Sequence, residues 1–175
     1  MKKTLFLMLI ILVALSSLIS AKGMQVGGAI GLYLPTGDAG DVFDPSIGLN
    51  GLFLYDWKEK MQLEGQIGFW MLSNGTDYKG FSARYIPILA GIRYFQSPQL
   101  HFDGGAGIYA WSFEWDLADY GWGLGKYSDS GSDIGIYGGA GYLLNNKIDL
   151  NARIHFPDFD DFFLGVTVGY LFDIQ

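Results

Sequence analysis

The stretch 162–175 alternates strictly between two kinds of side chain. Every second position is apolar: Phe162, Leu164, Val166, Val168, Tyr170, Phe172 and Ile174. The positions between them are mostly small or polar, with Phe163 and Leu171 as two apolar members. A period of two residues puts successive side chains on opposite faces of a β-strand. This stretch therefore predicts a strand with one wholly hydrophobic face.

Seven earlier stretches show the same period. The expected strands cover residues 24–34, 46–57, 61–72, 82–95, 100–111, 133–144, 147–156 and 162–175. Short turns alternate with longer loops, and the longest loop is expected at 112–132. Such a meander with an even number of strands is typical of outer-membrane barrels. The predicted fold is all-β: an eight-stranded antiparallel up-and-down transmembrane β-barrel. Because Pro87 cannot donate to a ladder, we expect a bulge or an interruption there.

The alternative with the same strands is a soluble barrel of the lipocalin type, whose apolar face points inward. Its outer face would then carry the second set of side chains, and a solvated surface is normally rich in Lys, Glu and Thr. Here that set is dominated by Gly. Small residues suit the narrow interior of an eight-stranded barrel. We therefore expect the apolar face to contact lipid.

Aromatic residues support this orientation. Near the short-turn ends of the strands, the outward positions are expected to form a girdle at one membrane interface: Tyr55, Trp57, Tyr94, Phe102, Tyr142, Tyr170 and Phe172. The inward positions carry charges of both signs, which are tolerated in a narrow lumen only when they pair. The predicted interior ionic cluster consists of Glu64, Arg93, Asp103, Asp149 and Arg153.

Residues 1–21 have a different character from the rest. Lys2 and Lys3 precede an apolar run, and small residues follow it. This layout predicts a cleaved secretory signal peptide at 1–21 and a barrel domain at 22–175. The formal net charge of −7 argues against nucleic acid as a partner, and the absence of Cys excludes disulfides and Cys-ligated metal.

The segment from Thr167 to Ile174 resembles the C-terminal targeting signal of bacterial outer-membrane proteins. In that pattern Thr167 is the polar residue, followed by Gly169, the aromatic Phe172 and the hydrophobic Ile174. Gln175 follows where a terminal Phe is usual. The stretch 22–175 resembles small porin-like barrels of the OmpA-transmembrane, OmpX and OmpW type. The resemblance implies the bacterial outer membrane, contact with its lipid and lipopolysaccharide, insertion by the outer-membrane assembly machinery, and a monomer.

The sequence contains little that predicts catalysis. His155 is expected to point inward near the outer end, but the Ser two places later that lipid A-modifying barrel enzymes would suggest is replaced by Pro157. His101 is expected at the opposite rim, in a structural role. The loops at the long end are acidic, which favours a solvated surface over a calcium site because no loop has the twelve-residue calcium motif. No cofactor or metal site is expected.

The expected interior also bears on transport. The residues Tyr33, Trp70, Tyr85, Tyr109, Trp111 and Tyr137 should point inward and fill the outer half. An eight-stranded barrel has room inside only for side chains. The favoured interpretation is therefore a non-enzymatic protein with a role in membrane integrity or adhesion. A narrow channel for small solutes is one alternative, and a lipid A-modifying enzyme is another.

Overall fold

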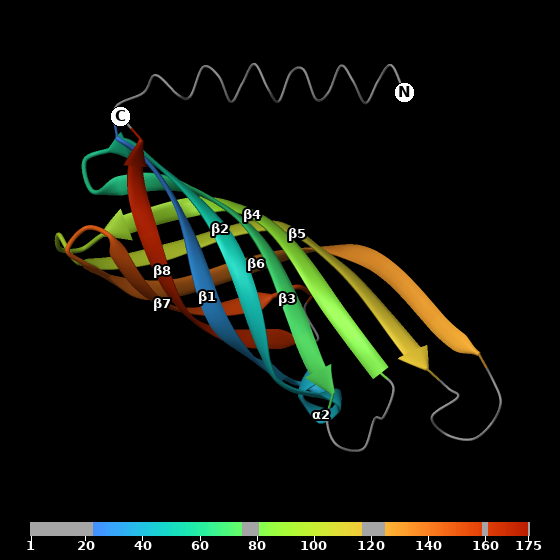
Figure 1. Cartoon of the computed structure of the whole chain (residues 1–175). Coiled ribbons are helices and arrows are strands. Elements are labelled where there is room, and N and C mark those ends of the chain that lie inside the picture. The colour runs from blue at the N-terminus through green and yellow to red at the C-terminus, as the bar shows by residue number, and fades with distance from the viewer. Residues whose placement is uncertain (1–22, 75–80, 117–124, 159–160, 175) are drawn as a thin grey trace, which may run out of the picture.

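The computed structural model of the chain describes residues 23–74, 81–116, 125–158 and 161–174. Eight antiparallel strands follow one another and close into a barrel, because the last pairs with the first (Figure 1). The strands are β1 (Met24–Thr36), β2 (Phe43–Lys58), β3 (Met61–Asn74), β4 (Phe81–Phe95), β5 (Leu100–Asp116), β6 (Lys126–Leu144), β7 (Ile148–Phe156) and β8 (Phe162–Ile174). The predicted all-β, eight-stranded up-and-down fold is confirmed. The expected signal peptide, residues 1–21, lies outside the described residues.

The alternation of the sequence becomes an outer and an inner surface. Apolar side chains of the first set are exposed on the outside, for example Leu49 (60%) and Val166 (56%). Large side chains of the second set, such as Trp70 and Arg93, are fully buried inside. This is the reverse of a soluble barrel. Among the described residues, no helix is long and apolar enough to cross a bilayer.

The short turns lie at the end of the barrel where β1 starts and β8 stops (Figure 1). Asn145 and Asn146 adopt φ values of 50° and 57° between β6 and β7. Asn tolerates this left-handed conformation better than most residues, which explains why the tight turn that the sequence predicts can form at these two residues. At the opposite end, the short helix α2 (Asp38–Val42) joins β1 to β2, inside a stretch expected to be loop.

Pro87 interrupts one ladder and not the other. β3 and β4 pair at Ile67↔Ile88 and again at Trp70↔Tyr85, with no pairing between them. The register is the same on both sides of this gap, so the β3–β4 ladder is interrupted while β4 itself continues without a bulge. On the other side Pro87 pairs with Tyr109 in an unbroken β4–β5 ladder. The missing N–H of proline explains why only one side is affected.

The prediction of a loop at 112–132 is wrong for residues 112–116 and 126–132, which belong to β5 and β6, and residues 117–124 lie outside the described residues. The β5–β6 ladder continues up to Asp116↔Lys126. Above the apolar belt, the polar side chains Ser112, Ser128 and Ser130 occupy outward-facing positions of the alternation, and aromatic side chains occupy inward-facing positions. The alternation persists with its polarity inverted, because this part of the hairpin rises above the lipid-facing belt. The rule that outward residues are apolar therefore does not predict the upper parts of β5 and β6.

Candidate functional site: the barrel interior

The structure brings all five residues of the predicted ionic cluster together inside the barrel. Arg93 on β4 lies 3.0 Å from Glu64 and 2.8 Å from Asp149. Arg153 on β7 lies 2.9 Å from Asp103 and also contacts Glu64. All five side chains are at least nine-tenths buried. The cluster thus links strands β3, β4, β5 and β7 across the lumen.

His101 on β5 is a further member that the sequence analysis left at the rim. Its Nε2 lies 2.8 Å from Asp149 Oδ1, and its Nδ1 lies 3.5 Å from Asp103 Oδ2. The imidazole is fully buried. Asp103 is two residues along the same strand, whereas the contact with Asp149 passes over Gly141 of the intervening strand β6 and could not be found from parity alone.

Amide side chains extend the network upward. Asn151 donates to Asp103 at 2.6 Å, and Gln66 accepts from Arg153. Asn50 accepts from Gln66 and donates to the Tyr33 hydroxyl at 2.7 Å. A cavity of about 10 Å³ lies among these groups. That volume is close to the smallest that holds one water molecule.

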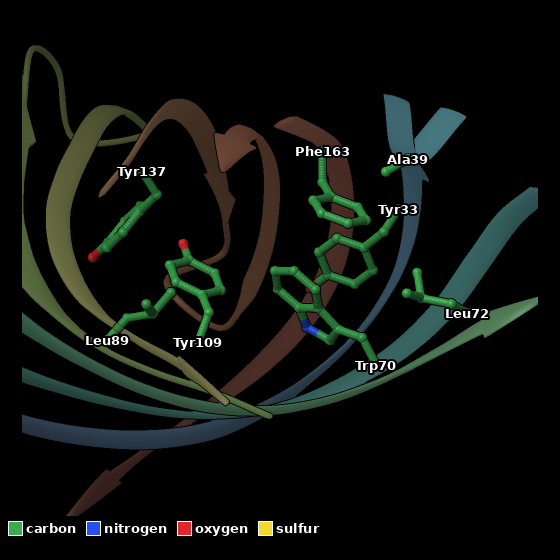
Figure 2. Close-up of a cluster of buried hydrophobic side chains, with 8 residues drawn as sticks. All are labelled: Tyr33, Ala39, Trp70, Leu72, Leu89, Tyr109, Tyr137 and Phe163. Atoms are coloured by element: carbon green, nitrogen blue, oxygen red, sulfur yellow. The ribbon is translucent and has the colours of Figure 1, made fainter. Parts of the chain in front are cut away.

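Above the polar network, aromatic rings fill the interior. Tyr33 stacks on Trp70 with ring centroids 4.0 Å apart, and Phe163 packs against Trp70 at 6.0 Å. Figure 2 shows these three rings together, with Tyr109 and Tyr137 on the other side of the lumen. Of the six predicted inward aromatics, Tyr33, Trp70, Tyr109 and Tyr137 are buried, whereas Tyr85 and Trp111 are half-buried. Phe163 was not expected in this layer.

His155 belongs to the aromatic layer. Its Nδ1 lies 3.0 Å from the Tyr109 hydroxyl, and the ring of Trp70 is 4.9 Å away. The side chain is 1% exposed. An imidazole enclosed in this way has a polar partner and packs as part of the interior.

A third group of inward side chains is apolar. Leu52, Leu54, Leu143 and Leu171 form a buried apolar group with Ala29, and Phe95 packs against it. Of these residues only Leu171 was noted from the sequence as an apolar member of the inward set. Leu54 pairs with Glu64 and Leu143 pairs with Asp149, so these apolar side chains fill the lumen beside the ionic cluster.

The predicted girdle residues lie on the outer surface, and the predicted targeting residues are divided between the outer and the inner surface. Trp57, Tyr94, Phe102, Tyr142, Tyr170 and Phe172 are exposed, and Tyr55 is half-buried. Tyr170 and Phe172 contact each other with ring centroids 4.7 Å apart on β8. Thr167 and Gly169 have inward parity, and Ile174 pairs with Met24 at the end of the β1–β8 ladder.

The described residues contain no group of three acidic or His side chains arranged to hold a metal ion. Three of the expected acidic loop residues, Asp77, Asp119 and Asp160, lie outside the described residues. At the long end, the Asp161 carboxylate accepts a hydrogen bond from the backbone N–H of Ala39 in α2, at 2.8 Å. This bond ties the short helix to the β7–β8 side of the mouth.

Comparison with known proteins places the fold in a family. Residues 5–172 match the family model of the outer membrane protein β-barrel domain. No curated protein matches the chain. Among solved structures, Ail, the attachment invasion locus protein of Yersinia pestis, is similar with a TM-score of 0.63 at 13% identity, over 87% of this chain and 100% of that chain.

Two further structures have the same fold at low identity. Neisserial surface protein A gives a TM-score of 0.55 at 15% identity, over 87% of this chain and 97% of that one. The N-terminal β-barrel domain of Pseudomonas aeruginosa OprF gives 0.56 at 13% identity, over 83% and 97%. The expected resemblance to small outer-membrane barrels is confirmed. The chain belongs to the outer membrane protein β-barrel domain family, which implies the bacterial outer membrane as its location.

Proposed function

We propose that this protein is a non-enzymatic, monomeric outer-membrane barrel that is closed to solutes and acts in membrane integrity or adhesion through its outer surface. The observation that carries the proposal is the filled interior. An apolar group, an ionic cluster and an aromatic layer together fill the lumen. An eight-stranded barrel has space only for side chains, and here those side chains bond one another.

The outer end supports a surface role. β5 and β6 have 17 and 19 residues, whereas β7 has 9. A spanning strand needs roughly 9 to 11 residues, so the β5–β6 hairpin is longer than the membrane requires. Its upper part extends beyond the barrel (Figure 1). The name of Ail refers to attachment and invasion, and by analogy we propose that this hairpin carries contacts with other molecules.

Conductance across a planar bilayer tests the closed lumen. The unmodified protein should give no steady current, and Arg153→Ala should raise conductance because it leaves space beside Glu64 and Asp103. A control with Arg84→Ala, an exposed side chain on the outer face of β4, should stay silent. A large steady current in the unmodified protein would support the alternative of a narrow channel and contradict our proposal.

The enzymatic alternative is weaker because His155 is enclosed by rings, as described above. Comparison of lipid A mass spectra from cells with and without the protein tests this point. Identical spectra are expected. A new or missing acyl or headgroup mass would mean that the barrel modifies lipid A.

Biogenesis forms part of the same proposal. We propose that residues 1–21 are removed during export and that the assembly machinery of the outer membrane reads the end of β8. N-terminal sequencing of the mature protein should begin at Lys22 or shortly after it. Lipid and lipopolysaccharide are the expected surroundings, because exposed apolar side chains encircle the barrel.

A further inference from the structure

The ionic cluster and His101 together form a closed ring of contacts inside the barrel. Each contact joins a side-chain nitrogen to a carboxylate oxygen, so basic and acidic groups alternate around the ring. In order, its members are Arg93, Asp149, His101, Asp103, Arg153 and Glu64, which contacts Arg93 again. We call these six residues the charge ring.

The charge ring is balanced only if its histidine is charged. Three carboxylates face two guanidinium groups, which keep their positive charge in proteins. A neutral imidazole would therefore leave one negative charge without a partner. All six side chains are at least nine-tenths buried, and a buried charge without a partner is costly. An imidazolium supplies the missing positive charge.

Both ring nitrogens of His101 lie beside a carboxylate. Nε2 is hydrogen-bonded to Asp149 at 2.8 Å, and Nδ1 lies 3.5 Å from Asp103, close enough for an ion pair. A neutral imidazole carries a proton on one nitrogen and a lone pair on the other, and an ionised carboxylate only accepts. The lone pair would then face a carboxylate oxygen. An imidazolium presents an N–H to each of the two carboxylates.

The other charges around His101 do not remove the need for this proton. The charged groups come from three strands: Asp103 on β5, Asp149 and Arg153 on β7, and Arg93 on β4. The two guanidinium groups disfavour a third cation nearby. Each of them also contacts Glu64 on β3, which offsets their positive charge. The balance over the whole ring therefore favours the imidazolium.

A glycine on the intervening strand makes room for the imidazole. Gly141 of β6 pairs with His101 on one side and with Asn151 of β7 on the other. A Cβ added at Gly141 would collide with Cε1 of the imidazole. The Phe95 ring lies against the imidazole with centroids 5.5 Å apart, and the histidine has no exposed surface. Protein groups, and not bulk water, therefore balance its charge.

We propose that His101 is held as an imidazolium that closes the charge ring, and that this ring makes the stability of the barrel sensitive to pH. Imidazole takes the proton in preference to the carboxylates because it is the stronger base. In alkaline solution it loses this proton, and one buried carboxylate charge remains without a partner. The inference concerns the interior alone and does not depend on the proposed surface role.

The direction of the pH effect follows from the number of bound protons. Histidine in an unfolded chain is mostly neutral above about pH 7, whereas the folded barrel keeps one proton on His101. Folding then takes up a proton, so the free energy of unfolding falls as the pH rises. One proton changes the equilibrium constant of unfolding by up to about tenfold per pH unit.

Nitrogen-15 NMR of the histidine-labelled full chain in lipid nanodiscs measures the protonation state directly. The chain has two histidines, and His155 is the internal control because it bonds to the Tyr109 hydroxyl and is enclosed by rings. At neutral pH we expect protons on both ring nitrogens of His101 and on only one of His155. Either His101→Gln or His155→Gln assigns the two signals.

A variant that balances the ring by another route separates charge from packing. Asp149→Asn leaves two carboxylates and two guanidinium groups, so His101 should be neutral in this variant at neutral pH. His101→Gln with Asp149→Asn has the same balance and should unfold at a higher urea concentration than His101→Gln alone. A shift in gel mobility on heating verifies that each variant is folded.

Urea unfolding in lipid vesicles tests the consequence for stability. Between about pH 7 and 9, the equilibrium constant of unfolding should rise more steeply for the unmodified protein than for His101→Gln, by up to about tenfold per pH unit. Asp149→Asn should likewise lose the steeper rise.

Three outcomes overturn the proposal. In the first, His101 of the unmodified protein has a nitrogen without a proton at neutral pH. In the second, Asp149→Asn leaves the imidazolium unchanged. In the third, Asp149→Asn or His101→Gln has the same pH dependence of unfolding as the unmodified protein. If His101→Gln does not fold, the spectra and unfolding of the unmodified protein and of Asp149→Asn still decide.

Discussion

Arg93 Nη2 lies 2.8 Å from Asp149 Oδ2, although the two residues are 56 positions apart on strands that are not neighbours in the barrel. The ion pair crosses the lumen from β4 to β7. Both side chains are buried. The barrel interior therefore depends on partners that only closure of the sheet brings together.

Loss of Arg93 should destabilise the barrel strongly. Arg93→Met leaves Glu64 and Asp149 without a cation that both contact, and removal of one partner of a buried pair costs about 3–5 kcal/mol. Adding Glu64→Gln should recover part of this loss, and Asp149 would keep its bond to His101. Urea unfolding in lipid vesicles measures the free energies. Arg84→Met is the control and should change stability little. Additive effects of the two substitutions would show that Arg93 and Glu64 do not interact.

A charge on the outer face of β6 should be costly only within the apolar belt. Ile136→Arg puts a guanidinium against lipid and should destabilise the barrel by up to about 2–4 kcal/mol, the range for the bilayer midplane. Ser132→Arg stands on the same face four residues higher, above the belt, and should be nearly neutral. Equal effects of the two substitutions in vesicle unfolding would mean that the belt has been placed wrongly.

Two adjacent glycines should respond in opposite ways to alanine. An added Cβ at Gly139, which faces inward, would collide with the Ala152 carbonyl oxygen and lie 2.6 Å from Arg153 Cγ. At Gly138, which faces outward, the nearest atom is 3.8 Å away. Gly138→Ala should therefore be neutral or stabilise by roughly 0.4–1 kcal/mol, because alanine restricts the unfolded chain. Gly139→Ala should destabilise. Similar unfolding curves for both variants would contradict this inward and outward assignment.

The end of β8 should matter for assembly more than other parts of the girdle. Tyr170→Ala with Phe172→Ala should reduce the amount of heat-modifiable barrel in outer-membrane fractions. The pair Tyr55→Ala and Tyr94→Ala removes girdle aromatics of other strands and should leave assembly closer to normal. If both double variants assemble equally, the targeting role of the β8 residues is lost, and only their interfacial role remains.

The local pattern of the chain was enough to predict the strand number, the topology and the face that meets lipid. The reason is that a period of two separates outward from inward residues without reference to any distant part of the chain. The inward placement of Glu64, Arg93 and Arg153 followed from the same rule. The unpaired gap beside Pro87 followed from the missing N–H of proline.

The tertiary structure alone decided which inward residues meet. His101 reaches Asp149 across Gly141 of β6, the strand between β5 and β7, and parity does not show that two side chains meet over an intervening strand. The hairpin extension was missed because its polarity inverts above the lipid, where the apolar-outward rule no longer holds. The extension of β5 and β6 is likewise a property of the closed fold: among the described residues β5 and β6 stay paired beyond the last pair of β6 with β7, and only the paired registers reveal this.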